Sequence, residues 1–189
     1  MNIKLLNCLP PKMYHLDFIQ SMNSSITSIV LPDWTCNDAD YRVFDFSRFT
    51  RVKSIEIGND CFGSVQTFKI EGLNRLKTIK IGINSFTQVK KILWDDDWEE
   101  AHKGINKTKS FHRLNCESLE SIQIGEGSFS DFAGEFELKN LPQLQSIQIG
   151  TIGTDSYNFH DSSFVIRGIE MILNIVMIRS SKSTIHYIG

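Results

Sequence analysis

Four cysteines and five histidines are the side chains of this chain best suited to bind a metal ion or to act as nucleophile and base. The cysteines lie far apart in the sequence, at Cys8, Cys36, Cys61 and Cys116. No two have the Cys-x-x-Cys spacing of a structural zinc site, so we expect them to be reduced, buried and inert, with a disulfide or a nucleophile as the alternative. The histidines are equally scattered, at His15, His102, His112, His160 and His186. The order of residues in the sequence alone therefore indicates no Cys/His or Ser/His/Asp catalytic site.

Acidic side chains cluster twice, in Asn37-Asp38-Ala39-Asp40 and in Asp95-Asp96-Asp97. The first cluster lacks the glycine turn and the distal glutamate of an EF-hand loop, and adjacent aspartates on a helix point in different directions. We expect both clusters to be solvated rather than to bind a metal ion. The chain is accordingly expected not to be an enzyme and to have no catalytic residues and no cofactor.

The dominant pattern of the chain is a repeat, and its clearest copy is Leu-Pro-Gln-Leu-Gln-Ser-Ile-Gln-Ile-Gly at residues 141–150. The central isoleucine of that copy recurs as six anchors, Ile29, Ile55, Ile79, Ile122, Ile147 and Ile175, at steps of 26, 24, 43, 25 and 28 residues. An aliphatic residue lies three positions before each anchor, and another lies two positions after it. A phenylalanine lies eleven positions before each anchor, at Phe18, Phe44, Phe68, Phe111, Phe136 and Phe164. A second phenylalanine follows three anchors by seven positions, at Phe62, Phe86 and Phe129.

A period in the twenties indicates one supersecondary unit stacked on copies of itself, because a single unit cannot cover its own apolar face. The alternation in Ser54-Ile55-Glu56-Ile57 predicts a strand that turns both isoleucines inward and Ser54 and Glu56 outward. A second extended segment begins at the earlier phenylalanine of each unit, as in Phe68-Lys69-Ile70. The sequence therefore predicts a mostly β repeat solenoid.

The repeat resembles the leucine-rich repeat family. Its pattern L-x-x-L-x-L-x-x-N/C-x-L matches Leu76-x-x-Ile79-x-Ile81-x-x-Asn84-x-Phe86 at every marked position. Isoleucine replaces most of the leucines, and the returning segment is extended rather than helical, so the units are similar to the variant called BspA-like. This resemblance implies a right-handed solenoid with a parallel sheet on its concave face and a protein-recognition role.

The repeat pattern also predicts how the chain is organised. We expect a lead-in that forms a weak cap at residues 1–22, one solenoid of about six units at residues 23–178 and a tail at residues 179–189. A net charge of −2 and a pI near 6.2 favour neither nucleic acid nor an anionic membrane as partner. No apolar run is long enough to span a membrane, and the N-terminus is a poor signal peptide, so a soluble, cytoplasmic protein is expected.

Both ends of the predicted solenoid raise alternatives. Trp34, in the least regular unit, is expected either to cover the open end of the stack or to be an exposed contact for a partner. At the other end, residues 169–178 keep the anchor spacing but replace outward polar positions with apolar ones. The chain could therefore self-associate there, be a fragment of a longer array, or fold Ile185, Tyr187 and Ile188 over the open edge.

The long step between Ile79 and Ile122 predicts an insertion at about residues 88–110. Trp94, Trp98, Ala101 and Ile105 share one stripe of a short amphipathic helix laid across the repeats. The two tryptophans are expected either to pack back on the solenoid or, with the loop Asn106-Lys107-Thr108-Lys109, to form a recognition element.

Two outward rows on the anchor strands are the candidate partner-binding surface. One position before the anchors lie the small hydroxyl residues Ser54, Thr78, Ser121 and Ser146. One position after them lie the longer polar residues Glu56, Lys80, Gln123 and Gln148. Such a shallow hydrogen-bonding face suits a protein or peptide better than a small molecule, which needs a deep apolar pocket. We therefore expect a non-catalytic recognition scaffold, with assembly through the solenoid ends as the alternative.

Overall fold

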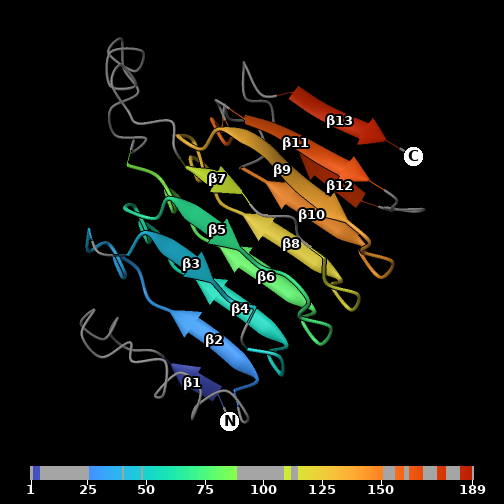
Figure 1. Ribbon diagram of the computed structural model, residues 1–189, viewed down its shortest axis with the longest axis horizontal. Helices are drawn as coiled ribbons and strands as arrows, with labels where there is room; N and C mark the ends of the chain where they lie inside the picture. The colour runs from blue at the N-terminus through green and yellow to red at the C-terminus, as the bar shows by residue number, and fades with distance from the viewer. Residues whose placement is uncertain are drawn as a thin grey trace.

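Two walls of parallel strands, joined by turns, form a mostly β solenoid (Figure 1). The computed structural model describes residues 2–4, 26–39, 41–47, 49–88, 109–111, 115–150, 156–159, 162–167, 174–177 and 184–188, without the side chains of residues 2–4, 174–177 and 184–188. No helix occurs within these ranges, and consequently none that could cross a membrane. The helix expected around Trp94 and Trp98 lies outside them.

The anchor strands form the first wall, a seven-stranded sheet in the order β1-β2-β4-β6-β8-β10-β12. Its strands are β1 (Asn2–Lys4), β2 (Ser28–Leu31), β4 (Ser54–Ile57), β6 (Thr78–Ile81), β8 (Ser121–Ile124), β10 (Ser146–Ile149) and β12 (Asn174–Met177). Each anchor isoleucine pairs with the next one, from Ile29 opposite Ile55 to Ile147 opposite Ile175. The register predicted from the sequence spacing is confirmed.

The phenylalanine segments form the second wall, in two three-stranded sheets ordered β3-β5-β7 and β9-β11-β13. Their strands are β3 (Val43–Asp45), β5 (Thr67–Lys69), β7 (Ser110–Phe111), β9 (Gly134–Lys139), β11 (Ser162–Arg167) and β13 (Thr184–Ile188). Phe44, Phe68 and Phe111 are register partners in one sheet, and Phe136 and Phe164 are partners in the other. The returning segments are therefore strands, as their alternation predicts.

A column of stacked phenylalanine rings fills the core between the walls. Phe62, Phe86, Phe129 and Phe159 stack in turn, with ring centroids 4.9, 4.8 and 5.4 Å apart and interplanar angles of 13°, 6° and 6°. All four have a positive φ, between 54° and 60°, a region that non-glycine residues enter at a cost. The same turn conformation therefore recurs in these four units and directs each ring inward.

The glycines that follow the anchor strands allow consecutive turns to approach closely. A Cβ on Gly82 would lie 2.5 Å from the carbonyl carbon of Gly58, and one on Gly125 would lie 2.5 Å from that of Gly82. No side chain fits between two backbones at this distance. The glycine column therefore allows the turns to pack directly on one another.

We expect Gly125→Ala to lower the free energy of unfolding by about 2–3 kcal/mol, because the new Cβ meets backbone that cannot move aside. Gly72→Ala is the control, since nothing lies within 4 Å of that position and its positive φ alone costs about 1 kcal/mol. Urea unfolding of both variants measures the difference. Equal losses would contradict the close approach of the turns.

Three features of the described chain bear on the sequence-based expectations for its two ends. Residues 2–4, expected in an irregular lead-in, form β1 and pair with β2 through Ile3 and Ile29. In the tail, β13 extends the second wall, and Ile185 takes the place of a phenylalanine opposite Phe164. Trp34 is 61% exposed, which favours the alternative of an exposed side chain over the one in which it covers the end of the stack.

The cysteines differ among themselves. Cys61 and Cys116 are free and buried, as expected. Cys36 is disulfide-bonded, which corrects the expectation that it is reduced. Sequence spacing could not reveal this, because a disulfide depends on which segments the fold brings together.

Candidate functional site

A groove of about 450 Å³ crosses the outer face of the anchor-strand sheet. Its walls are the two outward rows predicted from the sequence, namely Ser54, Thr78, Ser121 and Ser146 on one side and Glu56, Lys80, Gln123 and Gln148 on the other. Ser28 and Val30 of β2 extend it. Because the strands are in register, equivalent residues lie side by side at the strand spacing of about 4.8 Å. The structure thus brings together the eight candidate residues of the sheet.

Side chains of neighbouring strands pair along both rows of the groove. The Lys80 ammonium lies 3.1 Å from the Glu56 carboxylate, and both side chains are about half exposed. Farther along the same row, Gln123 Nε2 donates to Gln148 Oε1 at 3.0 Å. In the short row, Ser54 Oγ donates to Ser28 Oγ at 2.8 Å. The surface is therefore neutral overall and rich in both donors and acceptors.

This chemistry limits what the groove can bind. The one cation and the one anion among its lining residues pair with each other, so it offers no surplus charge to a polyanion or a polycation. Within the described residues no group of three or more His, Cys, Asp or Glu side chains is placed to hold a metal ion. What the groove does offer is hydrogen-bonding surface distributed over five strands.

Sequence comparison of the repeats missed a ladder of small polar side chains inside the turns. In four consecutive units, one side chain donates a hydrogen bond to a backbone carbonyl of the preceding unit. The bonds run from Cys61 Sγ to Pro32 (3.2 Å), from Ser85 Oγ to Gly58 (2.8 Å), from Ser128 Oγ to Gly82 (2.7 Å) and from Asn158 Nδ2 to Gly125 (2.7 Å). The signal was present in the sequence, because Cys61, Ser85 and Ser128 all lie six positions after an anchor. The ladder supports the turns and does not reach the groove.

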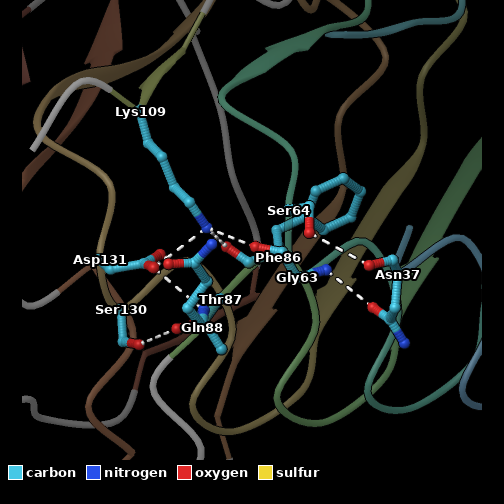
Figure 2. Close-up of polar contacts among 9 residues, drawn as sticks. All are labelled: Asn37, Gly63, Ser64, Phe86, Thr87, Gln88, Lys109, Ser130 and Asp131. Atoms are coloured by element: carbon cyan, nitrogen blue, oxygen red, sulfur yellow. Dashed lines mark hydrogen bonds and ion pairs between the residues drawn. The ribbon is translucent and has the colours of Figure 1, made fainter. Parts of the chain in front are cut away.

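A buried ion pair lies among the turns between the two walls (Figure 2). Lys109 Nζ lies 3.0 Å from Asp131 Oδ2, and the side chains are 4% and 0% exposed. The ammonium also donates to the carbonyl oxygens of Gly63 at 2.8 Å and Phe86 at 3.5 Å. One of the two alternatives from the sequence placed Lys109 in a recognition loop, and the structure instead buries its side chain. The missed signal is alternation, since Lys109 lies two positions before the inward Phe111.

Burial favours the protonated thiol at Cys61 and Cys116, the free cysteines of the described part of the chain. Burial raises the pKa of the Cys116 thiol to about 11, and burial likewise raises the pKa of Cys61. Because the thiolate is the reactive form, a pKa two units above the ordinary value lowers the reactive fraction about 100-fold at pH 8. The arrangement therefore argues against a nucleophilic cysteine at these positions.

We expect iodoacetamide at pH 8 to leave Cys116 unmodified in the folded chain and to alkylate it once the chain is unfolded in urea. Peptide mass spectrometry measures the extent at each cysteine. Rapid labelling of Cys116 in the folded chain would contradict its burial.

The remaining candidates, Trp94 and Trp98, lie outside the described residues, so their position relative to the groove is not described. Comparisons with protein-family models, with curated proteins and with solved structures give no match.

Proposed function

We propose that this chain is a non-catalytic recognition protein of the leucine-rich-repeat-like, BspA-like type, which binds a protein partner across the groove of its anchor-strand sheet. The observation that carries the proposal is the alignment of eight polar side chains from four consecutive strands along one groove. A repeat architecture supplies an extended surface of this kind without any catalytic chemistry.

The chemistry of the groove favours a protein over other partners. A nucleic acid or an anionic lipid surface requires a cluster of unpaired basic residues, and Lys80 is paired with Glu56. A protein surface presents both donors and acceptors, and interfaces typically contain about one hydrogen bond per 100–200 Å². Neutral pairs such as Gln123 with Gln148 can exchange their internal hydrogen bond for bonds to such a surface.

Affinity capture from the native cell extract tests the proposal. The intact chain is compared with a groove variant that carries Glu56→Ala, Lys80→Ala, Gln123→Ala and Gln148→Ala. A matched control changes polar residues of the second wall, Lys69→Ala, Glu71→Ala and Glu135→Ala, after folding of all three proteins has been verified.

The proposal predicts a protein that the intact chain and the control retain and the groove variant loses. Equal retention by the groove variant would contradict it. Capture of further copies of the chain alone would instead favour assembly through the solenoid ends.

A further inference from the structure

The buried pair of Lys109 and Asp131 has an uneven set of hydrogen bonds. Asp131 Oδ2 accepts from Lys109 Nζ and from the backbone N–H of Gln88, each at 3.0 Å. Asp131 Oδ1 is also buried but has no hydrogen-bond partner within the described part of the chain. A buried acceptor without a partner typically costs about 1–3 kcal/mol. The carboxylate is therefore poorly satisfied on one of its two oxygens.

Burial of the pair disfavours the charged forms of both side chains. The Lys109 and Asp131 side chains are only 4% and 0% exposed, so both charged groups have lost almost all contact with water. The ring of Phe132, 5.4 Å from Lys109 Nζ, and the Phe86 carbonyl oxygen only partly replace that solvation of the ammonium. Burial lowers the pKa of Lys109, although the nearby Asp131 carboxylate opposes this shift. A neutral lysine amine is a nucleophile. The site therefore holds a potential nucleophile against a carboxyl group in a water-poor environment.

We propose that Lys109 and Asp131 condense into an intramolecular isopeptide bond. Lys109 Nζ adds to Asp131 Cγ, and the bond from Cγ to Oδ1 breaks. The two protons that the nitrogen loses leave with Oδ1 as one molecule of water. An ammonium and a carboxylate thus become a neutral amide, with no oxidant, reductant or other reactant required.

The product fits the hydrogen-bonding groups around it better than the ion pair does. Oδ2 becomes the amide oxygen and keeps the N–H of Gln88, while the remaining N–H keeps the Gly63 carbonyl, 2.8 Å from Nζ (Figure 2). The oxygen that leaves is the one without a partner. Condensation also removes two buried charges, whose desolvation is costly. Fixed proximity of the reacting groups supplies the rate advantage of an intramolecular reaction.

The bond would link the residue that precedes β7 covalently to the turn between β8 and β9. Lys109 lies near the end of the predicted insertion and directly precedes β7, and Asp131 lies between β8 and β9. A covalent link here would keep the two halves of the second wall together, where β7 and β9 are in contact without strand pairing. This role is independent of whether the groove binds a partner.

Intact-mass spectrometry of the purified full chain, denatured and with its disulfide reduced, tests the proposal. The expected mass is about 18 Da below that of the sequence, the mass of one water. Tryptic digestion should give a branched peptide that joins Lys109 to Asp131. The control Lys109→Arg should have the full mass of its own sequence, because a guanidinium does not form this bond.

Two results would overturn the proposal. One is a wild-type mass equal to that of the uncondensed sequence, which would leave the pair as ions. The other is the same loss of mass in Lys109→Arg, which would place the dehydration elsewhere in the chain. The measurement on the wild-type chain decides the question even if the variant folds poorly.

Discussion

Truncation of Phe129 to alanine is expected to lower the free energy of unfolding by about 3–5 kcal/mol, the range for deleting a buried aromatic side chain. Phe129 is fully buried and lies between Phe86 and Phe159, with ring centroids at 4.8 and 5.4 Å. Alanine at the same positive φ of 60° keeps the backbone strain, so the loss reports the ring alone. Urea unfolding followed by circular dichroism measures it.

The control for this prediction is Val43→Ala in β3. Val43 is 65% exposed, and an exposed apolar residue away from the core changes stability by about 0.5 kcal/mol or less. A loss below about 1 kcal/mol for Phe129→Ala would mean that the phenylalanine stack does not form the core.

Replacing Asp131 by alanine is expected to lower the free energy of unfolding by about 3–5 kcal/mol, because it leaves the Lys109 charge buried without a counter-charge. The matched comparison is Glu56→Ala, which breaks an ion pair of similar length at the surface. Lys80 lies 3.1 Å from Glu56, against 3.0 Å for Lys109 and Asp131. An exposed pair contributes about 0–1 kcal/mol, so Asp131→Ala should be the more destabilising of the two variants.

A second comparison identifies the cause of the loss. The double variant Lys109→Met with Asp131→Leu removes both charges and should recover part of the stability that Asp131→Ala loses. If the double variant were no more stable than Asp131→Ala, the loss would come from packing or from a missing covalent link rather than from an unpaired charge. Urea unfolding of the variants distinguishes these cases.

The register of both walls could be predicted because apolar side chains recur at fixed distances from each anchor. The structure pairs Ile55 with Ile79, and Phe44 with Phe68, as the spacing indicated. The rows that line the groove followed from the same alternation, since a strand turns successive residues to opposite faces. Whether those rows bind a partner stays a prediction.

Two other features, Phe159 and β1, were not predicted from the aligned repeats. Phe159 belongs to the stacked column, yet five extra residues after Gly150 move it out of the expected spacing, where Thr154 stands instead. β1 had a signal that was overlooked, because Ile3 precedes Ile29 by 26 residues, the same step that separates Ile29 from Ile55.

The buried ion pair had no repeated counterpart to reveal it. Lys109 lies near the end of the predicted insertion, and Asp131 comes from the next unit, so only the fold brings them within 3.0 Å. The disulfide at Cys36 could not be predicted for the same reason, because it depends on a tertiary contact rather than on the repeat. Patterns within one unit predict strands and faces, whereas unique contacts between units require the structure.

Site-specific photo-crosslinking tests the central claim, that the groove is the recognition surface, most directly. A photoreactive amino acid replaces Gln123 in the groove of one protein and Glu135 on the exposed second wall of another, and both are irradiated in native cell extract. We predict a protein adduct from position 123 that is absent from position 135. Adducts from position 135 alone, or equal adducts from both positions, would contradict recognition through the groove.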